Sequence, residues 1–314
     1  LMGLLTKGTE TQSSMDIAEA VESVGAGLGA DAAADYSIIS LKTVSADFAD
    51  ILALAASLLR QPSFPPAEIE LERRLTLQQI RSMQEQPFTI GFNQLRLDMY
   101  GEHPYALPGV GTEASVASFS REQLLAFHQQ HFRPDNMVVT IVGRITPEAA
   151  VEQVQQTLGD WQKPDTLRPS LVFPTVPTQP RCSVIPQDTN QAIVMVGYPA
   201  ASVKHPAYAA LKLLNTYLGN GLSSRLFVEL REKRGLAYDV SAFYPTRLGL
   251  SQFVAYMGTA PDNAATALNG LRHEVERLRH EPLPEAELQA AKNKLLGQYA
   301  LGKQTNAQIA QLLG

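Results

Sequence analysis

The chain has 314 residues, of which 45% are hydrophobic and 18% are charged. This composition excludes a disordered or fibrous protein and suits two domains of ordinary size. The net charge of -5 and the single cysteine, Cys182, argue against nucleic-acid binding, a disulfide scaffold and a cysteine-rich zinc module. No apolar run approaches the roughly 20 residues that a membrane span needs, and the compartment, bacterial periplasm or cytoplasm, is left open.

Helical periodicity and capping signals predict helices along most of the chain. Ser13 and Asp16 form a capping-box pattern, and Gly25 is a typical helix end. Pro66 suits a first helical turn because it lacks the N–H that would be unsatisfied there. In chain order, helices are expected at residues 13–25, 46–59, 66–86, 121–131, 146–158, 206–217, 222–233 and 262–280, with the last one opening at Pro284.

Short apolar runs between these helices predict the strands. They are expected at residues 35–44, 137–143 and 192–200, with 237–244 and 252–258 as the arms of a hairpin. Residues 163–180 contain five prolines, so this stretch is expected to be an extended linker between domains.

An internal repeat supports a duplicated domain. The segment FPPAEI at 64–69 matches LPEAEL at 283–288, at an offset of 219 residues. We therefore expect an N-terminal domain at 1–165, a linker at 166–180 and a C-terminal domain at 181–314. Aligning the copies also predicts truncation at both ends, with about 40 residues missing before the first copy and about 70 after the second.

Six segments occur in a fixed order along the chain: KGTETQSS, VGAGLGADAAADYS, ERRLTLQQI, HPYALPGVGT, FRPDNMVVTIVG and LGNGLSSRLFVELREKRGLAY. Together they resemble the insulinase and pitrilysin superfamily of metallopeptidases, in the short form that includes mitochondrial processing peptidase. The resemblance implies an α+β fold of two similar lobes, each a mainly antiparallel sheet packed against helices. It also implies a chamber, shared with a partner chain, in which an extended peptide adds to a sheet edge.

The zinc site of active members has no full counterpart in this sequence. Those members hold zinc with an inverted H-x-x-E-H motif on one helix and a Glu from a second helix. Counted back from Lys-Gly-Thr at 7–9, the motif's Glu falls on Met2 and its second His on Gly3, while the distal Glu falls on Gln79, seven residues after Glu72. Glycine, a thioether and an amide supply neither a strong ligand nor a base. The resemblance thus predicts that this chain binds no zinc.

A second catalytic element of the family is matched. Its members carry an Arg and a Tyr seven positions apart, and Arg231 and Tyr238 fit that spacing. The resemblance implies that the pair reaches a partner's zinc site and stabilises charge on the scissile carbonyl. It also implies that Gly219, Gly221 and Ser223 contact the substrate. From the residues alone, Arg231 also suits a helix C-terminus and Tyr238 a packed strand.

These matches lead to one main hypothesis and two alternatives. The main hypothesis is a non-zinc subunit of a heterodimeric metallopeptidase that binds peptides or unfolded polypeptides, with zinc held by a homologous partner subunit. The first alternative is a non-catalytic peptide-binding or scaffold protein of the same fold, and the second is an autonomous peptidase with unusual ligands. The H-x-x-H pattern of His128 and His131 is interpreted as packing rather than a metal site.

Overall fold

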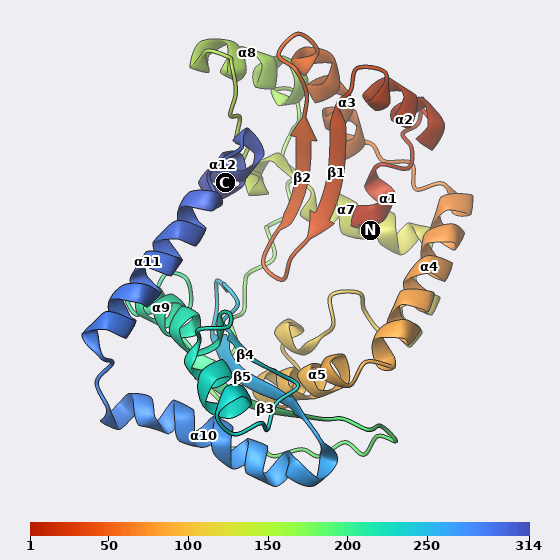
Figure 1. The fold of residues 1–314 in the computed structure, drawn as a ribbon. Coiled ribbons are helices and arrows are strands. Elements are labelled where there is room, and N and C mark those ends of the chain that lie inside the picture. The colour runs from red at the N-terminus through yellow and green to blue at the C-terminus, as the bar shows by residue number, and fades with distance from the viewer. The chain divides into compact units, whose positions relative to one another are not determined.

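The computed structural model describes all residues from 1 to 314. The chain forms two compact units, each built from separate stretches of sequence (Figure 1). Unit 1 contains Leu1–Ile80, Gly109–Leu171 and Leu301–Gly314, and unit 2 contains Arg81–Pro108 and Val172–Ala300. The junction after Leu171 falls within the proline-rich stretch, whereas 81–108 pack with unit 2 and 301–314 with unit 1.

Unit 1 combines a two-stranded antiparallel sheet with helices. Strand β1 (Gly27–Ala32) pairs with β2 (Ser37–Lys42) from Gly27 opposite Lys42 to Ala32 opposite Ser37. The helices of this unit are α1 (Met2–Leu5), α2 (Ser14–Glu22), α3 (Phe48–Arg60), α4 (Pro66–Gln84, whose last residues enter unit 2), α6 (Glu113–Ser118), α7 (Arg121–His131), α8 (Pro147–Leu158) and α12 (Asn306–Leu313).

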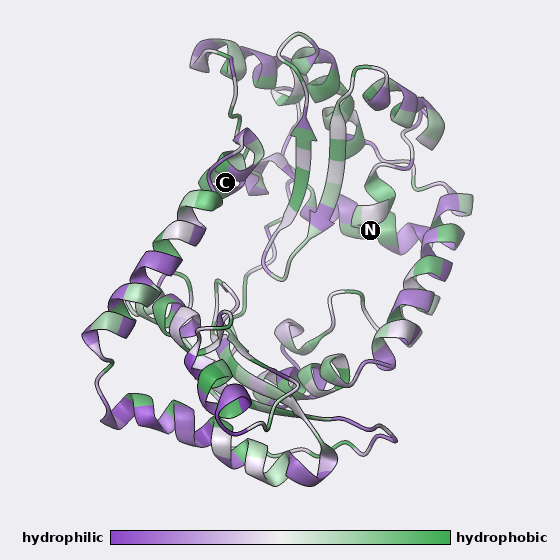
Figure 2. Cartoon of the chain, viewed as in Figure 1, coloured by the Kyte–Doolittle hydropathy of each residue, from purple (hydrophilic) through white to green (hydrophobic).

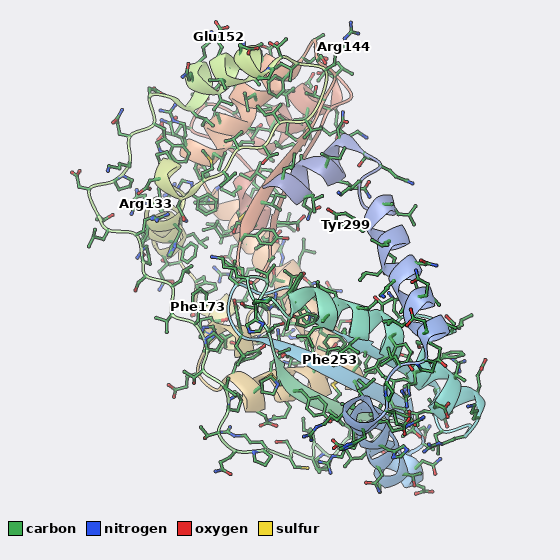
Figure 3. The ribbon with its side chains drawn as sticks, turned by 90° about the vertical axis from the view of Figure 1, so that its left-hand side faces the viewer. Arg133, Arg144, Glu152, Phe173, Phe253 and Tyr299 are labelled. Atoms are coloured by element: carbon green, nitrogen blue, oxygen red, sulfur yellow. The ribbon has the colours of Figure 1, made fainter.

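Two sets of contacts hold parts of unit 1 together. Ile17 of α2 and Leu58 of α3 are buried in one apolar cluster, so these two helices share a hydrophobic interface. Arg133, labelled in Figure 3, has a side chain only 3% exposed and donates to both carboxylate oxygens of Asp135, at 2.7 and 2.9 Å. It also contacts Thr166 Oγ1 at 3.4 Å. The FRPDN segment therefore holds the beginning of the proline-rich stretch.

Unit 2 is built on a three-stranded antiparallel sheet in the order β3-β5-β4. Its strands are β3 (Ala192–Ala200), β4 (Asp239–Phe243) and β5 (Ser251–Thr259). Its helices are α5 (Pro87–Tyr100), α9 (Tyr208–Gly219), α10 (Ala264–His280) and α11 (Glu285–Leu301), with a π-helix, η3, at Phe227–Glu232. Short 3₁₀ turns occur at Pro104–Ala106 in this unit, at Pro134–Asn136 in unit 1 and at Pro261–Asn263.

Helices cover both faces of the unit 2 sheet. On one face, α5 packs closely on β3, because a Cβ added at Gly197 would lie 3.0 Å from Leu95 of that helix. On the opposite face, Val240 and Met257 belong to the main hydrophobic core together with Leu218 of α9 and Leu271 of α10. The strands alternate their side chains between these two layers. Figure 2 shows hydrophilic residues along α10, as expected for a helix that covers a core with one face.

The structure confirms the α+β fold class and most of the expected elements. The repeat also has a structural counterpart, since α4 begins at Pro66 and α11 begins 219 residues later, at Glu285. The successive helices α3 and α4 of the first copy correspond to α10 and α11 of the second. None of the helices combines the length and apolar composition needed to cross a membrane.

Four expectations about elements were wrong or incomplete. Residues 137–143 are not a strand, because no neighbouring strand pairs with them: β1 and β2 pair only with each other. Half of the segment expected as an ordinary helix at 222–233 is the π-helix η3. Helices α5, α6 and α12 and strand β1 were not expected, and α12 follows the helix near Pro284, which is therefore not the last.

Candidate functional site

The positions that match the zinc site lie on α1 and α4 of unit 1. Met2 and Gly3 belong to α1, while Glu72 and Gln79 belong to α4. The structure brings two of them together, because a Cβ built on Gly3 would lie 2.6 Å from Oε1 of Glu72 and 3.1 Å from its Cδ. The Glu72 carboxylate thus fills the space into which a side chain at position 3 would project. Any larger residue there would require Glu72 to move.

These residues do not fit a zinc ion. Gly3 has no donor atom, Met2 has a thioether and Gln79 an amide, which leaves the Glu72 carboxylate as the one strong oxygen ligand. No group of three or more His, Cys, Asp and Glu side chains lies together anywhere in the chain in a way that could hold a metal. A catalytic zinc site needs about three protein ligands and a base, so we derive no reaction step through a metal in this chain.

The two histidines of the H-x-x-H pattern are occupied by packing. His128 is 5% exposed, its Nε2 lies 2.8 Å from the carbonyl oxygen of Leu59, and its ring stacks on Phe132 at 4.8 Å. Burial lowers the pKa of His128, although the contact with the Leu59 carbonyl acts to raise it. His131 stacks on Phe127 at 4.2 Å. The two imidazoles therefore serve the structure of α7.

Arg231 lies on the π-helix η3 of unit 2 and is exposed. Leu226 and Leu230, both completely buried, anchor this segment in the core. The guanidinium of Arg231 lies 4.9 Å from the ring centroid of Phe227 and forms no ion pair. The chain turns just after this segment at Gly235, whose φ of +61° favours glycine and whose N–H donates to the Arg231 carbonyl at 3.0 Å. Arg231 thus has a fixed backbone and a guanidinium that remains available for binding.

Tyr238 immediately precedes β4 and is 60% exposed. Its N–H donates to the carbonyl of Gly258 at 2.8 Å, so its backbone is already held by β5. A cavity of about 400 Å³ adjoins the next residue, Asp239, and is lined by Phe88 and Tyr256 among others. The Tyr256 hydroxyl donates to Asp239 at 3.0 Å, and burial, followed by this bond, raises the pKa of Tyr256 to about 12.

The glycine segment lies at the end of α9. A Cβ added at Gly219 would lie 1.9 Å from the backbone nitrogen of Ala242, so only glycine allows this close approach to β4. Ser241 Oγ donates to the Gly219 carbonyl at 2.5 Å. Gly221 has a φ of +94°, and Ser223 is exposed. All three predicted substrate-contact positions are thus in unit 2, with Arg231 and Tyr238.

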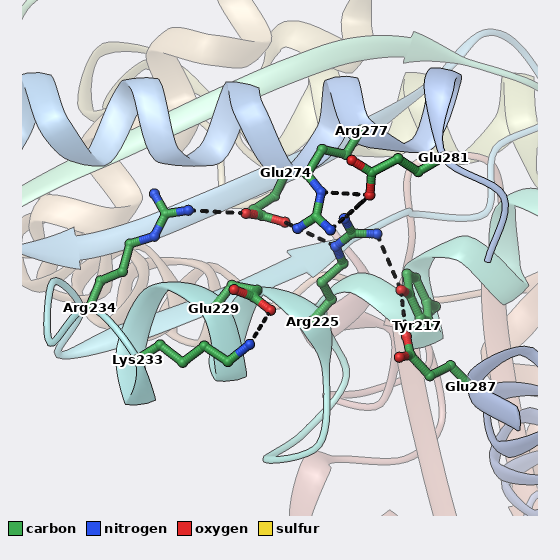
Figure 4. A network of polar contacts seen from close by, with 9 residues as sticks. All are labelled: Tyr217, Arg225, Glu229, Lys233, Arg234, Glu274, Arg277, Glu281 and Glu287. Atoms are coloured by element: carbon green, nitrogen blue, oxygen red, sulfur yellow. Dashed lines mark hydrogen bonds and ion pairs between the residues drawn. The ribbon is translucent and has the colours of Figure 1, made fainter. Parts of the chain in front are cut away.

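A polar network beside η3 was missed by the sequence analysis (Figure 4). Its centre is Glu274 of α10, which is completely buried. Glu274 Oε2 accepts from Arg225 Nε at 2.9 Å and from Arg277 Nη1 at 3.0 Å, and its Oε1 accepts from Arg234 Nη2 at 3.4 Å. The network continues to Tyr217, whose hydroxyl lies 3.2 Å from Arg225 Nη1. In sequence these residues look like ordinary charges of surface helices, which is why no pattern revealed them.

The network shifts the pKa of its members in consistent directions. Burial alone would lower the pKa of Arg225, but the hydrogen bonds with Glu274 and Tyr217 outweigh it and raise this pKa. The pKa of Arg277 is also raised, first by its hydrogen bond with Glu281. Burial and the hydrogen bond to Glu287 raise the pKa of Tyr217. The guanidinium groups of Arg225 and Arg277 therefore stay charged, and the Tyr217 phenol stays neutral, around neutral pH.

Comparisons with known proteins agree with this arrangement. Residues 1–113 match the family described as "Insulinase (Peptidase family M16)", and residues 118–295 match the "Peptidase M16 inactive domain". Proteins named uncharacterized zinc protease are similar along the whole chain. The Streptomyces coelicolor protein is 28% identical over 99% of this chain and 69% of its own length, and that of Mycobacterium tuberculosis H37Rv is 29% identical over 99% and 72%.

Solved structures show the same fold. The peptidase M16 inactive domain from Pseudomonas fluorescens has a TM-score of 0.90 and 28% identity, and the match covers 100% of this chain and 76% of that one. A protease from Helicobacter pylori has a TM-score of 0.91 at 22% identity, with 99% and 77% coverage, and so bears on the fold alone.

Proposed function

Because the chain belongs to the peptidase M16 (insulinase) family, we propose that it is the non-zinc subunit of a two-chain peptidase. In this proposal it pairs with a homologous subunit that carries an intact inverted zinc motif. The two subunits enclose peptides or unfolded polypeptides, and this chain contributes Arg231 and Tyr238 to the partner's zinc site.

One contrast within the chain carries the proposal. The zinc positions of unit 1 keep a single strong ligand, Glu72, and its carboxylate occupies the space beside Gly3. In unit 2, by comparison, Arg231 and Tyr238 have fixed backbones and exposed functional groups. A chain with one half of a catalytic apparatus suits a complex in which a second chain supplies the other half.

The chemistry available to the pair is hydrogen-bond donation to developing negative charge. A guanidinium and a phenol both donate, and neither needs to lose a proton for this role. In peptide hydrolysis, charge develops on the scissile carbonyl oxygen. Removing one such donor from an enzyme typically lowers kcat by about 10²- to 10³-fold. The cavity lined by Asp239, Phe88 and Tyr256 is a recess in the same unit that can receive part of a bound peptide.

The test is peptide hydrolysis by the reconstituted pair, using a zinc-bearing homologue from the same genome. We expect Arg231→Ala and Tyr238→Phe to lower kcat by about 10²-fold each while the two chains still associate. Lys233→Ala is the matched control, because Lys233 is exposed on the same segment and pairs only with Glu229, at 2.7 Å. Unchanged hydrolysis in Arg231→Ala would contradict the contribution in trans.

That outcome would favour the second candidate, a peptide-binding or scaffold protein. The observation behind it is the cavity in unit 2, which can hold part of a peptide without any hydrolysis. Zinc analysis and a peptidase assay of the chain alone test the remaining alternative. We expect no stoichiometric zinc and no hydrolysis, and the appearance of both together would establish an autonomous peptidase.

A further inference from the structure

We infer that Glu274 is the positioning residue of Arg231. It is a buried carboxylate that fixes, from the neighbouring helix, the segment that carries Arg231, residues 225–234. The inference rests on the proposed function for its kinetic consequence, but its structural part can be tested on this chain alone.

A single carboxylate holds both ends of the Arg231 segment. Arg225 begins the segment and binds Glu274 Oε2 at 2.9 Å, while Arg234 ends it and binds Oε1 at 3.4 Å. Arg231 lies between these two anchors. Figure 4 shows Glu274 extending from α10 between the two guanidinium groups. The segment cannot slide or rotate along α10 without breaking at least one of these bonds.

Close packing between the same two elements adds to this constraint. One turn before Glu274, a Cβ added at Gly270 would lie 2.9 Å from Leu230 Cδ2, so the glycine allows α10 to approach the segment. Leu230 is completely buried and directly precedes Arg231. The backbone of Arg231 is thus set by an apolar contact on one side and by the Glu274 bonds at both ends.

The π-helical form of the segment explains why it needs such anchors. The N–H of Lys233 donates to the carbonyl of Val228, five residues earlier, at 3.0 Å. Such wide turns are rare and less favourable than α-helical ones, and they occur frequently at functional sites. The conformation that directs Arg231 outward therefore depends on tertiary contacts, of which the charged bonds to Glu274 are the most directional.

The neighbouring acidic residues Glu229 and Glu276 do not bind across from the segment to α10 as Glu274 does. Lys233 and Glu229 pair at 2.7 Å within the segment, and no hydrogen bond or ion pair joins this pair to α10. Glu276 lies on α10 but binds Arg279 and His280 of the same helix, at 3.3 and 3.1 Å. Glu276 is therefore a natural control for Glu274.

The first experiment is hydrogen–deuterium exchange of the full chain. Glu274→Gln keeps the side-chain shape and removes its charge, and we expect amides within residues 226–236 to exchange at least about tenfold faster. Arg234→Gln should also speed exchange, but less, because the Arg234 side chain is 41% exposed. Glu276→Gln should leave the exchange unchanged. Equal exchange in Glu274→Gln and Glu276→Gln would overturn the inference.

The second experiment is kinetic and uses the reconstituted pair. We expect Glu274→Gln to lower kcat by about 10- to 100-fold with KM within about twofold, because misplacement of a catalytic group by about 1 Å has such an effect. In an Arg231→Ala background, Glu274→Gln should lower kcat no further. A purely structural role would instead add its loss in both backgrounds. If Arg231→Ala lowers kcat and Glu274→Gln does not, the inference fails while the proposed function stands; if neither does, both fail.

Discussion

The tightest contact around the candidate site predicts a large loss of stability in Gly219→Ala. The added Cβ would lie 1.9 Å from the nitrogen and 2.6 Å from the Cα of Ala242. Both are backbone atoms of a strand paired with β5, so they cannot turn aside as a flexible side chain would. Relief of the clash must separate α9 from β4, which also breaks the 2.5 Å bond from Ser241 to the Gly219 carbonyl.

The expected cost follows from these two losses. Overpacking costs about 1–3 kcal/mol, and an unsatisfied buried hydrogen-bonding group costs about 1–3 kcal/mol more. We therefore expect the free energy of unfolding to fall by about 3 kcal/mol, measured by urea denaturation, with Tm lower by roughly 6–12 °C.

Gly297→Ala is the control: it makes the same substitution, but we expect it to raise the free energy of unfolding rather than lower it. Gly297 lies within α11, and a Cβ there meets no heavy atom within 4 Å. Alanine is preferred over glycine in a helix interior by about 0.5–1 kcal/mol, so this variant should be more stable than the parent. If the free energy of unfolding of Gly219→Ala lies within about 0.5 kcal/mol of the parent chain's, α9 does not approach β4 as closely as the structure shows.

Two further predictions concern protonation. Burial lowers the pKa of His128 below its value of about 6.5 in an unfolded chain, so the folded state excludes a proton that the unfolded state binds. Its contribution to stability is therefore complete above pH 6.5 or so and is lost as the pH falls through the folded pKa, by at most about 1.4 kcal/mol per pH unit. Urea unfolding between pH 8 and 5 or so should show this loss in the parent chain and less of it in His128→Phe; equal slopes would contradict it. For Tyr256, with a pKa of about 12, ultraviolet titration of Tyr256→Phe should lose one late-ionising phenol while Tyr244, also at about 12, remains; an unchanged late phase would refute this assignment.

The elements that could be predicted from the sequence are those with their own local signals. The helix α2 begins with a capping box between Ser13 and Asp16, which the structure contains, and the helix after Pro66 begins at that residue. Helix α5 has a weaker local signal, a proline at its first position (Pro87), because Gln86 at its N-cap makes no side-chain bond to the backbone and Gly91 interrupts its interior. It is defined instead by packing on β3, a contact that no local pattern contains.

Strand prediction failed where pairing, rather than composition, decides the outcome. Residues 137–143 have the apolar, β-branched composition of a buried strand, yet Val138 is 74% exposed and no strand pairs with the segment. A strand exists only where a neighbour accepts its backbone hydrogen bonds. Similarly, Glu274 could not be singled out on α10, because a helix with many charges reads as a solvated surface until its neighbours are known.

Some residues near the candidate site are needed for folding, whereas others contribute little to it. Arg225 is only 9% exposed and binds a buried carboxylate, so replacing either partner would leave a buried charge uncompensated, whatever the protein does. Arg231 and Tyr238 are different: one has an exposed guanidinium that contacts a single ring, and the other a side chain that is 60% exposed. Exposed side chains of this kind contribute little to folding. Their match to the spacing of the family is therefore better explained by a binding partner than by the fold, and the hydrolysis assay of Arg231→Ala addresses that difference directly.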